Sequence, residues 1–301
     1  MRSKKNLTIP NRSHIGTERV NPRTQKLHTL SARGLVALMN RENQAVQRAM
    51  QRAAPALARF ITTAAPGFLA DGRLIYLGAG TSGRLGVLDA SEIPPTFCAD
   101  PGKVIGIIAG GDRSLRVPSE GAEDDPRGAL PELRRLRITA RDAVLGIAAG
   151  GTTPYVHGAL TWLRSLPQPP LCALLTCADV PAPDGAQRIL LATGPEVLTG
   201  STRLKAGTAT KLALNTISTA LMTLSGKVYG NLMVDVKATN AKLRDRAVRI
   251  VCQLTGITRA KAITLLASAQ WSAKTAVVMH RERHDLDGAE QWLEKHGGRL
   301  A

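Results

Sequence analysis

Two short stretches of the chain combine small residues with adjacent hydroxyl groups, and each follows an apolar run of strand length. The first is Gly78-Ala-Gly-Thr-Ser-Gly83, and the second is Ala149-Gly-Gly-Thr-Thr-Pro154. Glycine allows a tight turn, and a helix that begins there points free N–H groups and its positive dipole end at the turn. Both stretches are typical of a phosphate-binding turn, and a purely structural tight turn is the alternative interpretation.

Acidic residues near these stretches could supply general acid–base chemistry. Glu92 stands just before Pro94, which we expect to end the helix that begins at the first stretch. A carboxylate near a helix C-terminus gains nothing from the dipole, so local structure does not explain Glu92. The second acidic group is Glu120-Gly-Ala-Glu123-Asp-Asp125, which follows another strand-like run. It is either the acidic first turn of a helix or part of the same site.

The segments that must position these residues alternate between strand and helix. Apolar runs of strand length occur at residues 73–77, 104–108, 143–148, 171–176 and 188–191. Helical segments separate most of them, which predicts an α/β fold with a doubly wound, five-stranded parallel sheet. Ligands bind such sheets beyond the C-terminal ends of the strands, where the strand order reverses. If the first and third strands are neighbours, their two hydroxyl-bearing turns face one crevice.

Helical periodicity predicts the elements on either side of this α/β region. Residues 31–68 carry apolar side chains at helical spacing, and we expect two helices there with a break near Pro55. The polar, basic residues 1–20 before them are expected to be mobile, and residues 1–14 to be dispensable for catalysis. The last stretch of the chain, residues 241–301, is predicted to form a small helical bundle.

A long helix should follow the fifth strand. Ser201 or Thr202 is the expected N-cap, which places Lys205 in the first turn. A lysine in that position opposes the helix dipole, so we expect an anion close to its ammonium group.

The composition limits the class of partner. The 301 residues carry a formal net charge of +17, and residues 1–60 hold twelve Lys and Arg against two Glu. Such a balance can indicate nucleic acid, but aromatic residues are only 3% of the chain and no zinc or RNA-binding motif is present. We therefore interpret the charge as a solvated basic surface, which would also attract an anionic substrate. No apolar window reaches membrane-spanning length, and the four cysteines lack metal-site spacing, so neither a membrane nor a metal is expected.

Five blocks of the sequence together resemble the N-acetylmuramic acid 6-phosphate etherases, which belong to the sugar isomerase (SIS) domain group. The blocks are Gly78–Arg84, Asp89–Thr96, Glu120–Asp124, Glu196–Thr208 and Gly226–Asp235. The likeness runs from Thr17 to Gly298, almost the whole chain. The related glucokinase regulatory protein shares several of the same blocks.

The resemblance implies that the protein removes the D-lactyl ether from C3 of N-acetylmuramic acid 6-phosphate, leaving N-acetylglucosamine 6-phosphate and D-lactate. It implies elimination followed by water addition, in the cytoplasm, during cell-wall sugar recycling, by a homodimer without metal or cofactor. Glu92 is then the acid that protonates the departing lactate, and Glu123 is the base at C2. The residues expected to bind the substrate and its phosphate are Gly80, Thr81, Ser82, Gly83, Gly150, Gly151, Thr152, Thr153, Ser201, Thr202 and Lys205.

The expected organisation is a basic N-terminal segment (1–30), a flavodoxin-like SIS domain with its N-terminal helices (31–240) and a C-terminal helical domain (241–301). One departure from the family pattern lies in the turn expected to bind the phosphate, where Gly150 stands in place of the usual serine and its hydroxyl group. The alternative function is a non-catalytic sugar-phosphate-sensing regulatory protein. The presence of both expected catalytic glutamates and the length of 301 residues favour the enzyme.

Overall fold

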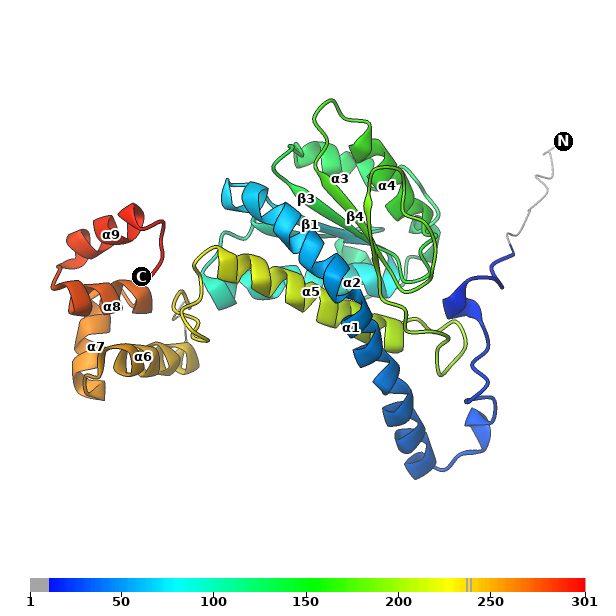
Figure 1. Ribbon diagram of the computed structural model, residues 1–301, viewed down its shortest axis with the longest axis horizontal. Helices are drawn as coiled ribbons and strands as arrows, with labels where there is room; N and C mark the ends of the chain where they lie inside the picture. The colour runs from blue at the N-terminus through cyan, green and yellow to red at the C-terminus, as the bar shows by residue number, and fades with distance from the viewer. Residues whose placement is uncertain (1–10, 237, 239, 301) are drawn as a thin grey trace.

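A five-stranded parallel sheet forms the centre of the protein, as the sequence predicts (Figure 1). The computed structural model describes residues 11–236, 238 and 240–300. The strand order is β2-β1-β3-β4-β5, the flavodoxin-like order. The strands are β1 (Leu74–Gly78), β2 (Val104–Ile108), β3 (Ala143–Ile147), β4 (Leu171–Thr176) and β5 (Gln187–Leu190).

Helices cover both faces of the sheet (Figure 1). The covering helices are α1 (Ala32–Leu69), α2 (Gly80–Phe97), α3 (Leu130–Arg135), α4 (Pro154–Arg164) and α5 (Lys205–Leu224). Successive side chains of a strand point to opposite faces, so β1 contributes to two hydrophobic clusters. Leu74 and Tyr76 pack with α1, α2 and α5, whereas Ile75 and Leu77 pack with α3 and α4. Burial on both faces explains why the central strands are continuously apolar.

Helix α1 is a single helix of 38 residues, so the predicted break near Pro55 is wrong. Pro55 and Pro66 both lie inside it at exposed positions. A proline inside a helix removes one N–H donor and crowds the carbonyl four residues earlier. Pro55 lies on the exposed side of the helix, and buried Ala53, Leu57 and Phe60 hold the helix on the core across the proline.

Helix α2 continues through Pro94, so the expectation that Pro94 ends it is also wrong. Ile93 and Phe97 are buried on its core side and keep the last turn packed. The helix ends at Phe97, and its C-cap Cys98 has a left-handed φ of 47°. Glu92 therefore lies inside the helix, on its exposed side.

Residues 11–30, which we name the N-terminal strap, pack against the α/β domain. Its Ile15, Thr17 and Asn21 are buried. The expectation that residues 1–20 are mobile is therefore wrong for residues 11–20, and residues 1–10 lie outside the described residues. Short 3-10 helices occur in the strap and after β2. They are η1 (Gly16–Glu18), η2 (Leu27–Thr29), η3 (Asp112–Leu115) and η4 (Glu120–Ala122).

The C-terminal helices form a bundle with a third hydrophobic cluster of its own (Figure 1). They are α6 (Ala241–Thr255), α7 (Arg259–Ser268), α8 (Ala273–Glu282) and α9 (Leu286–Lys295). Asp235, in the segment after α5, binds Lys274 of the bundle at 2.7 Å and Lys227 at 2.9 Å. Within the described residues, no single helix is long and apolar enough to span a membrane, and only the bent pair α6 and α7 meets the length and composition criteria together.

Candidate active site

The turns after β1 and β3 adjoin at the C-terminal edge of the sheet. β1 pairs with β3 on one side and with β2 on the other, so the strand order reverses between β1 and β3. The first and third strands are thus neighbours, which was the condition for their two hydroxyl-bearing turns to face one crevice. A pocket of about 540 Å³ lies at this edge. The expected site residues that line it are Gly80, Thr81, Ser82, Glu123, Gly150, Thr152, Thr153 and Thr202.

Two of the expected phosphate-binding glycines serve the fold rather than the pocket surface. A Cβ on Gly83 would lie 2.6 Å from the Gly78 carbonyl oxygen and 2.7 Å from Ile108 Cγ1. Gly83 therefore allows α2 to pack closely on the strands. Gly151 has a φ of +74°, and a Cβ there would overlap the side chain of Val180.

The first turn has the donors that a phosphate needs. α2 begins at Gly80 with Ala79 as its N-cap, and no side chain caps this N-terminus. Its first N–H groups have no partner within the helix, and the hydroxyl groups of Thr81 and Ser82 stand beside them. Backbone donors, hydroxyl groups and the positive end of an 18-residue helix together favour an anion at this turn.

Glu123 is held at the pocket by two contacts with the β3–α4 connection. Its carboxylate oxygen Oε1 accepts a hydrogen bond from the Thr153 hydroxyl at 3.0 Å. Its backbone carbonyl accepts a hydrogen bond from the Tyr155 N–H, also at 3.0 Å. The acidic segment after β2 is thereby fastened to the start of α4, and Glu123 is among the residues that line the pocket.

Glu92 lies away from this pocket. Its side chain is 58% exposed, and Oε2 lies 3.5 Å from Nζ of Lys211 on α5. It stands twelve residues beyond Gly80 on the same helix, or about 18 Å along the axis at 1.5 Å per residue. It does not line the pocket that contains Glu123. The two expected catalytic carboxylates are therefore not brought together within one chain.

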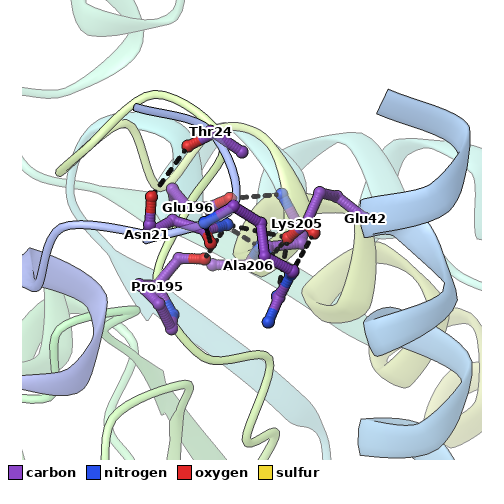
Figure 2. A network of polar contacts seen from close by, with 8 residues as sticks. Asn21, Thr24, Glu42, Pro195, Glu196, Lys205 and Ala206 are labelled. Atoms are coloured by element: carbon purple, nitrogen blue, oxygen red, sulfur yellow. Dashed lines mark hydrogen bonds and ion pairs between the residues drawn. The ribbon is translucent and has the colours of Figure 1, made fainter. Parts of the chain in front are cut away.

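Lys205 has the anionic partner that its position suggested, but that partner is a protein side chain. Nζ lies 3.1 Å from Oε2 of Glu42 on α1, and both side chains are at most 2% exposed (Figure 2). Arg23 Nε and Asn21 Nδ2 donate to the same carboxylate at 2.6 and 2.8 Å. Chiefly the hydrogen bond from Arg23 lowers the pKa of Glu42 to about 2. Lys205 does not line the pocket, and instead ties α5 to α1 and to the strap.

The N-terminus of α5 is capped by Glu196, so the expected cap by Ser201 or Thr202 is wrong. The Glu196 carboxylate accepts the backbone N–H groups of Lys205 and Ala206 at 3.0 and 2.9 Å (Figure 2). Burial raises the pKa of this carboxyl group, and the two N–H donors oppose that rise. Thr202 is thereby left to line the pocket, whereas Ser201 does not line it.

Sequence reasoning missed several residues of the pocket. The strap contributes Arg12, Ile15 and Glu18, and Arg84 and Arg203 line the pocket from α2 and from the connection before α5. One signal in the sequence could have indicated that the strap contributes to the pocket, because the family likeness begins at Thr17 rather than at the first strand. Arg12 lines the pocket, which argues against the expectation that residues 1–14 are dispensable. That expectation stays a prediction, and residues 1–10 lie outside the described residues.

Comparisons with known proteins agree with this architecture. The model of the glucokinase regulatory protein N-terminal SIS domain matches residues 56–164. A curated N-acetylmuramic acid 6-phosphate etherase from Gloeobacter violaceus is 51% identical over 97% of this chain and 95% of its own length. Etherases from a Synechococcus strain and from Edwardsiella ictaluri are each 48% identical, over 96% and 94% of this chain and 92% and 94% of their own. The chain belongs to the N-acetylmuramic acid 6-phosphate etherase family.

Proposed function

We propose that this protein cleaves the D-lactyl ether of N-acetylmuramic acid 6-phosphate in the cytoplasm, giving N-acetylglucosamine 6-phosphate and D-lactate. It acts as a carbon–oxygen lyase in cell-wall amino-sugar recycling. The observation that carries the proposal is one pocket in which Glu123 lies beside the uncapped N-terminus of α2, in a chain of the etherase family.

The sugar phosphate is anchored at the turn after β1. The N–H groups at the start of α2 and the hydroxyl groups of Thr81 and Ser82 donate hydrogen bonds to the phosphate oxygens, and Thr152 supplies a further hydroxyl donor from the opposite turn. The phosphate does not react, so its binding energy fixes the orientation of C2 and C3.

Ether cleavage proceeds through the open-chain aldehyde of the sugar, in which the carbonyl acidifies the C2 proton. Glu123 removes that proton, the bond from C3 to the lactyl oxygen breaks, and a C2–C3 double bond forms. Glu92 donates a proton to the departing oxygen. Water then adds at C3 and a proton returns to C2, so one water is consumed for each ether cleaved.

Glu92 reaches the substrate from a second copy of the chain. Within one chain it lies about 18 Å along α2 from the phosphate turn, too far to act on a sugar bound there. The exposed side of α2 and α5 around it carries Leu88 and Leu212, which are 42% and 39% exposed. A homodimer that buries this side would cover both leucines and bring Glu92 of one subunit to the Glu123 pocket of the other.

The test is turnover in heavy water, followed by proton NMR of the sugar. Elimination and water addition should leave one deuterium at C2 of the product and solvent oxygen at C3. Glu123→Gln should abolish both C2 exchange and lactate release, because the base is lost. Glu92→Gln should stall lactate release while unreacted substrate still exchanges its C2 proton. General acid–base steps contribute roughly 10²–10⁴-fold each, so both losses are measurable.

Two results would contradict the proposal in different ways. Lactate release without C2 deuterium would point to direct displacement at C3. Binding of the 6-phosphosugar without any lactate release would favour the sugar-phosphate sensor.

A further inference from the structure

The pocket contains more positive charge than its phosphate site uses. Arg12, Arg84 and Arg203 all line it, together with Glu18 and Glu123. The groups proposed to donate hydrogen bonds to the phosphate are backbone N–H groups and hydroxyl groups at the start of α2 and the hydroxyl of Thr152, and none of them belongs to an arginine side chain. The proposed phosphate site therefore does not explain why three guanidinium groups line the pocket.

The arginines differ in their contacts. Arg84 Nε donates to the Leu115 carbonyl at 3.1 Å, which ties its side chain to the segment after β2. Arg12 and Arg203 have no carboxylate within ion-pair distance in the part of the chain that the structure describes. Both are exposed, so each guanidinium group is available to a ligand.

Arg12 and Arg203 belong to segments that lie against each other. Arg12, Ile15 and Glu18 are three residues apart in successive turns of the strap, and all three line the pocket. Glu18 Oε2 lies 3.2 Å from the place that a Cβ on Gly200 would take, so the strap contacts the connection that carries Arg203. Two guanidinium groups and the one carboxylate of Glu18 leave one net positive charge on this side of the pocket.

We propose that Arg12 and Arg203 bind the carboxylate of the lactyl group and so distinguish the ether substrate from its cleaved product; this inference rests on the proposed function. The substrate carries two anionic groups, a phosphate and a carboxylate, and N-acetylglucosamine 6-phosphate carries only the phosphate. A guanidinium group presents a planar fork of donors that matches a carboxylate.

This assignment has a consequence for the reaction itself. The lactyl carboxylate is attached to the carbon that bears the departing oxygen, so its charge opposes the negative charge that develops on that oxygen. Guanidinium groups on the carboxylate offset this repulsion and hold the ether bond in one orientation. Once the bond breaks, the sugar loses these contacts and keeps only its phosphate anchor, which favours its release.

The anchoring of the strap makes the position of Arg12 dependent on the fold. Asn21 and Arg23, later in the strap, bind the buried Glu42 carboxylate at 2.8 and 2.6 Å. Ile15 is 3% exposed and fixes the segment between that anchor and Arg12. The buried side chains of Ile15 and Asn21 therefore fix the segment that carries Arg12.

The experiment compares Arg12→Gln, Arg203→Gln and the double variant with the wild-type full chain. Lactate release gives kcat/KM for the ether substrate, and calorimetry gives Kd for N-acetylglucosamine 6-phosphate. The double variant should lose about 10- to 100-fold in kcat/KM, the range for charge-assisted hydrogen bonds, and its Kd for the product should not change. Arg116→Gln is the matched control, because Arg116 is exposed, does not line the pocket and removes the same charge.

A substrate analogue that carries a carboxamide in place of the lactyl carboxylate completes a thermodynamic cycle. In this cycle the two arginines are removed from the protein, the carboxylate charge is removed from the ligand, or both are removed together. The wild-type enzyme should lose about as much on this analogue as the double variant loses on the true substrate, and the double variant should lose little more. Equal losses for product and substrate, an equal loss in Arg116→Gln, or no loss at all would overturn the inference while leaving the etherase activity in place. Failure of the proposed function is distinct, because the wild-type protein would then release no lactate, and both proposals would fall.

Discussion

The hydroxyl of Thr153 donates a hydrogen bond to the carboxylate of Glu123 across 3.0 Å, and the two residues come from different connections of the sheet. Glu123 follows β2, and Thr153 is the N-cap of α4 after β3. Thr153 does not use its hydroxyl to cap its own helix. That hydroxyl instead orients the carboxylate proposed as the base at C2.

Thr153→Val should therefore lower kcat more than it changes KM. Valine keeps the shape of the side chain and removes the donor, and a hydrogen bond to a charged group contributes about 1.5–3 kcal/mol. We expect kcat to fall roughly 10- to 100-fold, measured as lactate release at saturating substrate. Thr153→Ser keeps the hydroxyl and should stay near the wild-type rate. A loss confined to KM would show that Thr153 contacts the phosphate and does not position the base.

Mixed dimers should test the placement of Glu92 and Glu123 in different subunits. Each homodimer of Glu92→Gln or of Glu123→Gln has no intact site. If each site takes one glutamate from each subunit, a mixed dimer regains one intact site. Random mixing by co-expression should then restore roughly a quarter of the wild-type rate. No recovery in a mixture proven to contain mixed dimers would place both glutamates in one chain.

Gly150→Ser should be accepted by the fold and should keep or improve affinity for 6-phosphosugars. A Cβ at Gly150 would find only Thr17 Oγ1 within 4 Å, at 3.8 Å. The Thr17 hydroxyl is buried and has no hydrogen-bond partner in the described residues, so the added hydroxyl has room and a neighbour. One neutral hydrogen bond contributes about 0.5–1.5 kcal/mol, so KM should fall at most roughly tenfold.

Two controls accompany this change. Gly150→Ala fills the same space without a hydroxyl and should leave KM near wild type. Gly151→Ser should destabilise the protein, because Gly151 has a φ of +74° and a side chain there would overlap Val180. A much weaker binding of substrate by Gly150→Ser would show that the turn is already filled by the ligand.

The Glu42 carboxylate should make folding stability depend on acid. Its pKa is lowered to about 2 from 4.5, so the unfolded chain binds a proton more readily than the folded one between these values. The contribution is present above about pH 4.5 and is lost as the pH falls toward 2, for a total of about 3 kcal/mol. Urea unfolding of wild type and Glu42→Gln between pH 6 and pH 3 should show the difference in unfolding free energy shrinking.

Near neutral pH, Glu42→Gln should cost about 3–5 kcal/mol, because it leaves the buried ammonium of Lys205 without its carboxylate. Glu132→Gln is the control, since Glu132 forms an exposed pair with Arg135 and should cost at most about 1 kcal/mol. Equal costs in the two variants would mean that the buried ion pair does not stabilise the fold.

The sequence by itself determined the elements whose signals are local. Apolar runs buried on both faces predict strands, and Gly-rich, hydroxyl-bearing turns before helix starts predict the anion site, because both depend on neighbouring residues. Alternating strands and helices predict a parallel sheet, but the order β2-β1-β3-β4-β5, which brings Thr81 and Thr152 to one pocket, is a finding of the tertiary structure.

Only the tertiary structure decided the partners that are distant along the chain. Pro55 does not break α1, because the core packing of Leu57 and Phe60 outweighs one lost backbone hydrogen bond. The anion beside Lys205 is Glu42, 163 residues away, and no local pattern connects them. The polar strap is ordered by the contacts it makes with that ion pair, and Glu92 is separated from Glu123 by the length of one helix. Such relations depend on which surfaces meet after folding, and the spacing of residues along the chain does not encode them.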